Sequence, residues 1–293
     1  MGGMSTSFKK VAIIGKYKSP DIALPLLDMA HFLEDRNISV VLDRLTASHI
    51  GDCAFPVMEL DEIGAEVELA IVIGGDGTML NIARTLAPHG VPLVGINQGR
   101  LGFLTDISVH TMFETMGHIL AGKFVTESRM LLAAEVVSND EPVFNVMALN
   151  DVVVTKGAAG NMIEFDVRVD GQFVYTLRSD GLIVTSPTGS TAYALSSGGP
   201  ILHPSLCLMG VVPISPHTLA ARPIVVAGDS VVEVRMHEAE DVRVHFDSHS
   251  HCDLNGDDRV RVRRAPVEVR LLHPVGHNYY RMLREKLRWS ESL

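Results

Sequence analysis

The spacing of apolar residues changes near residue 127, and this change limits the folds open to the chain. Before it, four short apolar runs occupy residues 11–15, 38–42, 67–73 and 91–96, and residues 20–34 between the first two have helical spacing. Strands that alternate with helices favour βαβ units and a parallel sheet. The first part of the chain is therefore predicted to be an α/β domain.

Apolar and polar residues alternate one by one through much of the remainder. The pattern covers residues 163–169, 232–236, 242–246, 260–262 and 267–271. Asp170–Gly171 follows the first of these segments and predicts a tight hairpin turn. Alternation of this kind is typical of antiparallel strands with one polar face, so we expect a β-rich, two-layer, mainly antiparallel domain.

The last residues return to helical spacing, with Met282, Leu283, Leu287 and Trp289 as the apolar positions. We expect this C-terminal helix to pack back on the first domain. The predicted division is an α/β domain over residues 1–127, a β-rich domain over residues 128–277 and the returning helix over residues 278–293.

Charge and cysteine content exclude several classes of protein. Lys and Arg number 25 against 35 Asp and Glu, a formal net charge of -10. Because such a surface repels phosphodiester backbones and anionic lipid, neither nucleic acid nor a membrane is an expected partner. Cys53, Cys207 and Cys252 are odd in number and lack CxxC spacing, which indicates a reducing compartment. The opening residues have no apolar signal core, so a cytoplasmic enzyme is expected.

A glycine-rich turn, Gly74-Gly75-Asp76-Gly77-Thr78, lies between the apolar run that ends at Ile73 and a helix predicted to end near Pro88. Glycines at a strand-to-helix turn let backbone N–H groups approach a phosphate, and the helix start favours an anion. A carboxylate repels phosphate, so Asp76 needs another task, either accepting a proton from an attacking hydroxyl or holding a metal. The alternative is an ordinary corner with Asp76 or Thr78 as the helix cap.

Two more segments carry polar groups at strand ends. Residues 180–184 predict a strand, and the hydroxyl-rich residues 185–191 follow it before a short helix that ends near residue 200. These hydroxyls can serve ribose and phosphate oxygens, or they can simply cap the helix. Asn150-Asp151, just before an apolar run, suits a ribose diol or an adenine edge, although Asn-Asp also forms ordinary turns.

Together these segments resemble the signature blocks of the NAD kinase family, in that family's order. The resemblance rests on residues 74–78, 96–104, 150–151, 180–200 and 214–219. GGDGT alone is shared with lipid kinases and, more loosely, with phosphofructokinases. Residues 186–193 are the discriminating block. The resemblance covers nearly the whole chain and implies an enzyme that phosphorylates the 2′-hydroxyl of the adenosine ribose of NAD, with ATP or another phosphoryl donor, to give NADP.

The resemblance also implies a role for each matching position. Asp76 would be the general base for the ribose 2′-hydroxyl, with Gly77 beside the dinucleotide. Asn150, Asp151 and Asp180 would hold the NAD ribose or base. The same role falls to the six residues Thr191, Ala192, Tyr193, Ala194, Leu195 and Ser196. The β-rich domain would therefore bind NAD.

Three further contacts are carried over from the resemblance. Arg178 stands where a residue near the phosphates is expected, and Asn161 follows the glycine-rich residues 157–160. His249 belongs to a block that departs from the family pattern, since Asp247-Ser248-His249 replaces Asp-Gly-Gln. The family's usual Asn-Glu is Asn150-Asp151 here, so the shorter Asp151 is expected to make a weaker or water-bridged contact.

Cofactors and partners follow from the same resemblance. They are Mg²⁺ or another divalent cation with ATP, NAD as the substrate, and a second or further copy of the chain in a homodimer or homotetramer. No side chain is assigned as a metal ligand. The competing functions are a lipid kinase that shares GGDGT and a dinucleotide-binding regulator that does no chemistry.

Two other patterns have simpler interpretations. His245, His249, His251, Cys252 and Asp253 could together face a soft divalent metal, but an ordinary solvated strand face is favoured. The alternating basic segment 259–264 is interpreted as an edge strand with a polar face.

Overall fold

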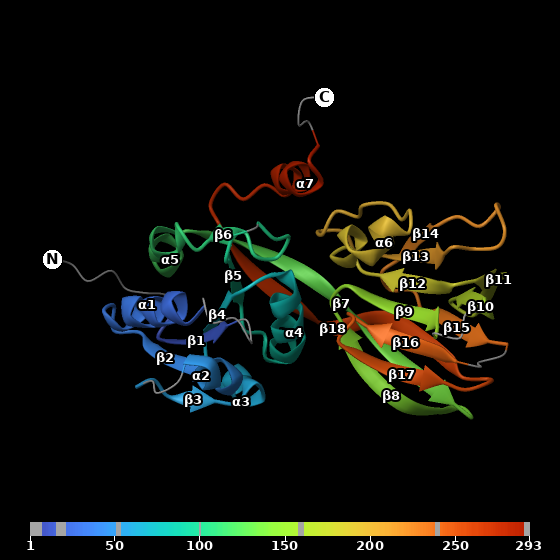
Figure 1. Ribbon diagram of the computed structural model, residues 1–293, viewed down its shortest axis with the longest axis horizontal. Helices are drawn as coiled ribbons and strands as arrows, with labels where there is room; N and C mark the ends of the chain where they lie inside the picture. Colours follow the sequence, from blue (N-terminus) through green and yellow to red (C-terminus); the bar gives the residue numbers. More distant parts are fainter. Residues whose placement is uncertain are drawn as a thin grey trace. The chain divides into compact units, whose positions relative to one another are not determined.

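A computed structural model of the protein describes residues 8–15, 22–50, 54–99, 101–157, 161–237 and 241–289. Two compact units divide the chain (Figure 1). Unit 1 comprises Met1–Ser128 and Val269–Leu293, and unit 2 comprises Arg129–Glu268. Two long strands, β7 (Phe124–Ser138) and β18 (Arg259–Pro274), have residues in both units.

Unit 1 is built on a parallel sheet with the strand order β3-β2-β1-β4-β5, and β6 also pairs with β5. Its strands are β1 (Lys10–Gly15), β2 (Ser39–Asp43), β3 (Val57–Met58), β4 (Leu69–Ile73), β5 (Leu93–Asn97) and β6 (Ile107–Ser108). Its helices are α1 (Ala23–Glu34), α2 (Arg44–Ile50), α3 (Leu60–Glu66), α4 (Asp76–Leu86), the 3-10 turn η2 (Ala87–His89), α5 (Met112–Leu120) and α7 (Tyr279–Leu287).

Helices lie against both faces of this sheet, which explains its uninterrupted apolar strands. All five residues of β4 are buried. Helices α1 and α5 share one hydrophobic cluster with Val94 and Ile96 of β5. Gly95 between them points to the other face, where a Cβ atom would lie 2.2 Å from the Leu104 carbonyl oxygen and 2.7 Å from the side chain of Met79 in α4. The close approach of the backbone at Leu104 to β5 therefore depends on this glycine.

Unit 2 contains two sheets of antiparallel strands. One has the order β11-β10-β15-β18, with β7 and β8 also attached, and the other has the order β14-β13-β12-β9-β16-β17. Besides β7 and β18, the strands are β8 (Glu141–Ala148), β9 (Asp151–Lys156), β10 (Ile163–Val169), β11 (Gln172–Ser179), β12 (Gly181–Thr185), β13 (Leu208–Ile214), β14 (Ile224–Ala227), β15 (Val232–Met236), β16 (Val242–Phe246) and β17 (Ser250–Leu254). The short helices η3 (Gly189–Thr191) and α6 (Tyr193–Ser196) follow β12.

The alternating residues of unit 2 meet in one core between the two sheets. Phe165 and Val167 of β10 join Val244 and Phe246 of β16 in a single cluster. Asp170 and Gly171 have positive φ angles of 52° and 77°, and Val169 pairs with Gln172 across the turn, so the predicted hairpin is confirmed.

The predicted fold class, an α/β unit with a parallel sheet and a mainly antiparallel β unit, is confirmed. The edge-strand interpretation of residues 259–264 is wrong, because β18 pairs with β15 and also with β7. Its polar face is real, since Val260 and Val262 are buried while Arg261 between them and Arg263 after them are not.

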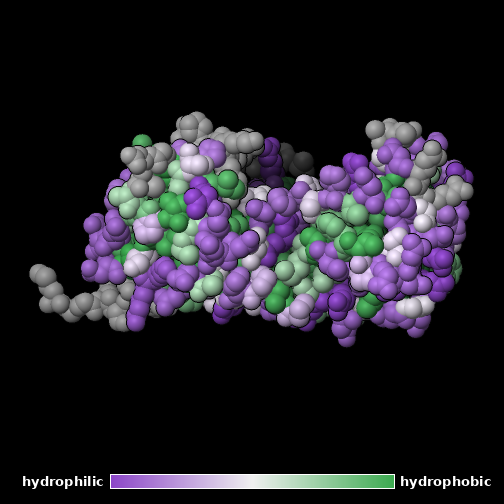
Figure 2. All heavy atoms as spheres, turned by 90° about the horizontal axis from the view of Figure 1, so that it is seen from below, coloured by the Kyte–Doolittle hydropathy of each residue, from purple (hydrophilic) through white to green (hydrophobic). Residues whose placement is uncertain are grey.

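Hydrophilic side chains cover most of the face shown in Figure 2, and apolar side chains form patches bounded by them. Among the described residues, no helix is long and apolar enough to cross a membrane.

Candidate active site

The glycine-rich turn of unit 1 joins β4 to α4. The Gly74 N–H donates to the Ile96 carbonyl at 2.8 Å, which ties the turn to the neighbouring strand β5. Gly75 is the N-cap of α4, and Asp76 is its first residue. Cβ atoms added at Gly75 and Gly77 would meet nothing within 4 Å, and both residues are exposed. Open space therefore lies beside a helix start that favours an anion.

Asp76 is held by a loop that follows β5. The Phe103 N–H donates to Asp76 Oδ2 at 2.8 Å, and the Leu104 N–H donates to Oδ1 at 3.0 Å. The Thr105 hydroxyl is 3.3 Å from the same Oδ1. Asp76 is partly exposed. The carboxylate thus has a fixed orientation and still reaches the surface beside the two open glycines.

The loop itself is shaped by Asn97 and Gly102. Asn97 is buried, and its Nδ2 donates to the carbonyls of Thr105 and Ile107 at 3.0 Å each. A Cβ atom at Gly102 would lie 2.1 Å from Asp76 Oδ1 and 2.2 Å from the Thr105 hydroxyl. Only glycine lets this loop close over the carboxylate.

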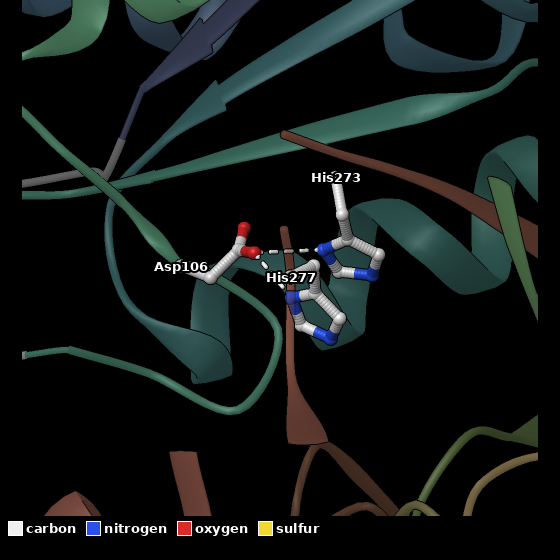
Figure 3. A group of neighbouring side chains, drawn as sticks. All are labelled: Asp106, His273 and His277. Atoms are coloured by element: carbon white, nitrogen blue, oxygen red, sulfur yellow. Dashed lines mark hydrogen bonds and ion pairs between the residues drawn. The ribbon is translucent and has the colours of Figure 1, made fainter. Parts of the chain in front are cut away.

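Beyond the loop, Asp106 meets two histidines that follow in sequence nearly 170 residues later (Figure 3). Asp106 Oδ2 lies 2.9 Å from His273 Nδ1 and 2.8 Å from His277 Nδ1. His273 Nε2 lies 3.0 Å from Glu127 Oε2. The rings of His273 and His277 are stacked with centroids 3.9 Å apart. Asp106, His273, His277 and Glu127 are called the Asp106 cluster below.

The Asp106 cluster is buried and charged. Burial alone raises the pKa of Asp106, but hydrogen bonds from His273 and His277 outweigh it and lower that pKa to about 2. Burial lowers the pKa of His273, but its bonds to Asp106 and Glu127 raise that pKa to about 9. At neutral pH, His273 is therefore a cation between two carboxylates.

In unit 2, the backbone around Asn150-Asp151 is held by Asp247. Its Oδ2 accepts from the Leu149 N–H at 2.8 Å, and its Oδ1 accepts from the N–H groups of Asn150 and Asp151 at 2.7 and 3.1 Å. The Asp247 N–H returns a bond of 3.0 Å to the Asp151 carbonyl. Asp247 therefore fixes the backbone on which the Asn150 and Asp151 side chains are mounted.

Asp151 has an unusual acidity for a carboxyl group. Its side chain is buried, with 5% of its surface exposed. Burial, followed by the nearby negative charge of Asp247, raises the pKa of Asp151 to about 7. Near neutral pH this group is close to half protonated, so it can donate as well as accept a hydrogen bond.

The hydroxyl-rich segment after β12 packs on the same backbone. The Asn150 carbonyl accepts from the Ser186 N–H at 2.9 Å and from the Thr185 hydroxyl at 3.2 Å. The Ser186 hydroxyl donates to the Leu149 carbonyl at 2.5 Å. A Cβ atom at Gly189 would lie 2.2 Å from the Asn150 carbonyl oxygen, so this close packing requires glycine. The two predicted segments are thus in contact.

Only some side chains of the stretch from Thr191 to Ser196 are exposed at the surface. Ala194 is buried among Val153, Ile183, Val212 and Ile214, so its methyl group anchors α6 to the sheet. Tyr193 and Ser196 are exposed, whereas Thr191, Ala192 and Leu195 are half-buried. The Thr191 hydroxyl donates to the Thr188 carbonyl at 3.2 Å. Only some of these six side chains can therefore face a ligand.

The other predicted residues of unit 2 lie in different places. Asp151 pairs with Thr185 at one end of β9 and β12, and Thr155 pairs with Gly181 at the other. Asp180 lies just beyond that second end, opposite Lys156 and about 16 Å from Asp151 along the strands, and forms a 2.7 Å ion pair with Lys156. Arg178 is exposed, 3.8 Å from Glu164. The predicted contacts therefore cluster at two ends of one strand pair.

Asn161 and His249 are exposed. Asn161 is in the connection between β9 and β10, where residues 158–160 fall outside the described residues, as does Arg100 in unit 1. His249 follows Asp247 in the turn between β16 and β17. His249 therefore lies two residues after Asp247, the residue that accepts from the Asn150 N–H.

The histidine-rich segment of β16 and β17 has no converging metal ligands within the described part of the chain. His245 and His251 are paired across the two strands, with ring centroids 5.7 Å apart. Ligand-type atoms do converge in unit 1, where those of Asp106, His273 and His277 all lie within 4.8 Å of one another. His249, His251 and Asp253 are exposed.

A glycine-rich turn at a helix start, with an oriented carboxylate beside it, is an arrangement that suits a nucleotide-dependent phosphotransferase. Residues 11–124 match the family model of the ATP-NAD kinase N-terminal domain, and residues 149–274 match that of the ATP-NAD kinase C-terminal domain. The chain belongs to the ATP-NAD kinase family, and the resemblance seen in the sequence is confirmed.

Relatives and solved structures agree with this assignment. The chain is 60% identical over 289 residues to the NAD kinase of Nitrosomonas eutropha, covering 99% of this chain and 98% of that relative. It is 60% identical over 287 residues to the NAD kinase of Nitrosospira multiformis, covering 98% of each. An NAD kinase from Archaeoglobus fulgidus in complex with ATP has a TM-score of 0.74 at 26% identity, over 95% of this chain and 98% of that one.

A second solved structure, yeast NADH kinase complexed with NADH, has a TM-score of 0.89 at 22% identity. It covers 97% of this chain and 89% of the yeast chain. At this identity, the likeness concerns the fold.

Several residues of the site escaped the sequence analysis. Asn97 stands inside a family-like block, yet its role in shaping the loop depends on two carbonyls eight and ten residues away. Asp247 was passed over in favour of its neighbour His249. The Asp106 cluster had no spacing signal, because its members come from three distant segments.

Proposed function

We propose that the chain transfers the γ-phosphoryl group of ATP to the 2′-hydroxyl of the adenosine ribose of NAD, giving NADP, with Asp76 as the general base. Membership of the ATP-NAD kinase family supports the reaction. Relatives about 60% identical over nearly the whole chain are named NAD kinase. The chain is therefore a phosphotransferase, and the residue roles below are our own assignment.

The observation that carries the assignment is the fixed orientation of the Asp76 carboxylate. Its oxygens accept from Phe103 and Leu104, and the adjoining Gly75 and Gly77 leave open space. A ribose hydroxyl in that space donates its proton to Asp76 while its oxygen bonds to the γ-phosphorus, and ADP leaves. Little covalent chemistry falls to the protein, so catalysis is mainly positioning and electrostatic stabilisation.

Unit 2 supplies the proposed NAD contacts. Asn150 and Asp151 meet the ribose or base, and a half-protonated Asp151 can both donate to and accept from such groups. Asp180, Arg178, Asn161 and His249 are proposed contacts as well. So are the six residues Thr191, Ala192, Tyr193, Ala194, Leu195 and Ser196, with Ala194 acting through its backbone, since its side chain is buried.

ATP enters as its complex with Mg²⁺ or another divalent cation, which offsets the phosphate charge. The solved relative from Archaeoglobus fulgidus is a complex with ATP, which supports ATP as the donor. A homodimer or homotetramer in the cytoplasm completes the proposal.

The test is turnover of NAD to NADP by the Asp76→Asn variant. Removing a positioned base typically lowers the rate by about 10²–10⁴-fold, whereas the KM for NAD should change by less than about threefold. The side-chain amide of the introduced asparagine would also place one of its N–H groups against the N–H of Phe103 or Leu104, so one of these two hydrogen bonds would be lost. Thr105→Val is the matched control, because it removes one loop contact and keeps the carboxylate; it should lose less than about tenfold.

Two outcomes would change the assignment. An Asp76→Asn variant with turnover close to that of the unmodified chain would remove Asp76 from the base role. A chain that binds NAD in the presence of MgATP without forming NADP would be the dinucleotide-binding regulator, and one that phosphorylates a lipid instead would be the lipid kinase.

A further inference from the structure

The loop that orients Asp76 continues directly into the Asp106 cluster. Phe103, Leu104 and Thr105 donate to the Asp76 carboxylate, and the next residue is Asp106. Asp106 is held from the other side by His273 and His277. A shift of Asp106 would therefore move the three donors that fix the Asp76 carboxylate.

His273 is the central member of the cluster. Its side chain is 1% exposed, and each of its ring nitrogens faces a carboxylate, Asp106 at 2.9 Å and Glu127 at 3.0 Å. A neutral imidazole has one N–H, so donation to both acceptors requires the doubly protonated cation. Among the described residues, His277 is stacked on His273, and Arg281 lines a small pocket with Asp106 and His277.

The geometry of the cluster fits hydrogen bonds better than metal ligation. Both histidine Nδ1 atoms point at the same oxygen, Oδ2 of Asp106, as the dashed lines in Figure 3 show. Ligand atoms of a tetrahedral zinc ion lie 2.0–2.2 Å from the metal, so about 3.3 Å from one another. The nitrogen–oxygen distances of 2.9 and 2.8 Å are those of charge-assisted hydrogen bonds.

We propose that His273 is a positioning residue for Asp76: by holding Asp106, it fixes the loop whose Phe103 and Leu104 N–H groups orient the catalytic carboxylate. The inference rests on the proposed role of Asp76 as the base. His273 comes from β18, nearly 200 residues after Asp76, and acts on the reaction through the loop. Its loss should lower kcat and leave the KM values almost unchanged.

Two substitutions separate the two bonds of His273. The Nδ2 of asparagine occupies the position of histidine Nδ1, so His273→Asn keeps a donor toward Asp106 and loses the one toward Glu127. The Nε2 of glutamine occupies the position of histidine Nε2, so His273→Gln keeps the bond to Glu127 and loses the one to Asp106. Both variants remove the same buried cation, so their melting temperatures should be similar.

The expected result is an unequal loss of turnover. His273→Gln should lower kcat by about 10–100-fold, since a displacement near 1 Å at a reacting group has effects of this size. His273→Asn should lose less than about fivefold, and the KM for NAD and for MgATP should stay within about threefold in both. Equal losses of kcat in the two variants, or an unchanged kcat in His273→Gln, would overturn the proposal.

A double-mutant cycle with Asp76→Asn distinguishes this inference from the proposed function. If His273 acts through Asp76, His273→Gln should cost less than about threefold once Asp76→Asn is present. If the factor is the same in both backgrounds, the positioning role is wrong and the base role of Asp76 stands. If Asp76→Asn alone retains full turnover, the base role is wrong.

Elemental analysis of the dialysed protein completes the test. We expect no transition metal in a stoichiometric amount. An ion bound one to one that is lost in His273→Gln would show that the cluster ligates metal, and the proton-based positioning role would fall.

Discussion

Asp76 in unit 1 and Asp247 in unit 2 use their carboxylates in the same way. Each accepts hydrogen bonds from consecutive backbone N–H groups of a distant segment. For Asp76 the donors are Phe103 and Leu104, and for Asp247 they are Leu149, Asn150 and Asp151. Each carboxylate thereby fixes a loop, because it accepts from backbone N–H groups that have no partner among the described residues of the loop itself.

The surroundings of the two carboxylates differ. Asp76 begins an 11-residue helix and adjoins two glycines with open space beside them. Asp247 lies in a turn with a φ of 50°, and its charge acts on the buried Asp151 beside it. The same hydrogen-bond pattern therefore serves a group proposed to react in one unit and a purely supporting group in the other. What separates them is the open space beside Asp76, where Gly75 and Gly77 carry no side chain.

The largest effect on stability is expected from Asp247→Ala. Three backbone N–H groups would lose a charged acceptor, and bonds of this kind contribute about 1.5–3 kcal/mol each. Water would reach part of the site, so we expect the free energy of unfolding to fall by about 4 kcal/mol, measured by urea denaturation. Asp247→Asn, which keeps one oxygen, should lose less. A loss below about 1 kcal/mol for Asp247→Ala would show that Asp247 does not hold this backbone.

The second prediction concerns Asp151 and pH. Its folded-state pKa of about 7 lies above the ordinary aspartate pKa of 3.8, so the folded chain binds more protons than the unfolded chain between these values. Stability should therefore fall as pH rises from about 4 to 7, by about 3 kcal/mol from this group. Asp151→Asn mimics the neutral form and should flatten the pH dependence. An unchanged slope of unfolding free energy against pH in Asp151→Asn would contradict the assigned burial effect.

The His273 cation has a dependence of the same sign at higher pH, and Asp106 has the opposite one. Its folded-state pKa is raised to about 9, so its contribution is complete below its ordinary pKa of 6.5 and is lost as pH rises through 9. The pKa of Asp106, lowered to about 2, makes its contribution complete above 3.8 and lost as pH falls through 2. Unit 1 should thus lose stability at the extremes of pH and unit 2 across the acidic-to-neutral range.

The sequence predicted those parts of the fold that are encoded locally. The strands β1, β2, β4 and β5 lie on the four predicted apolar runs, and the hairpin at Asp170-Gly171 uses residues that tolerate positive φ. The short helices α2 and α3 and the two-residue strand β3 were missed, because seven residues or fewer give little periodic signal. Strand β18 was read as an edge because alternation does not tell how many neighbours a strand has.

The candidate site also has one part that the sequence predicted and another that it did not. The motifs around Asp76, Asn150 and residues 185–191 were visible because glycines and hydroxyls gather at strand ends. Their supports were not visible, since Asp76 is separated by 27 residues from Phe103, and Asp247 by 97 from Asn150. A carboxylate that meets backbone N–H groups across such a separation leaves no pattern in the sequence, because the donors are present at every residue.

The third and smallest effect on stability compares two glycines of unit 1, one that has no room for a Cβ atom and one that has open space beside it. At Gly102, an added Cβ atom would lie 2.1 Å from Asp76 Oδ1, so Gly102→Ala must displace the loop or rotate the carboxylate. We expect a loss of about 2 kcal/mol in unfolding free energy together with a lower kcat. At Gly77, the added Cβ atom meets nothing within 4 Å.

Gly77→Ala is therefore the matched comparison for Gly102→Ala. Gly77 is the second residue of α4, where alanine is the better helix former by up to about 1 kcal/mol, so stability should stay level or rise slightly. If phosphates approach the open glycines, the same methyl group should raise the KM for MgATP or NAD severalfold. Unchanged KM values in Gly77→Ala would mean that the ligand keeps away from this turn, and Asp76 would then resemble Asp247, a carboxylate that only supports its loop.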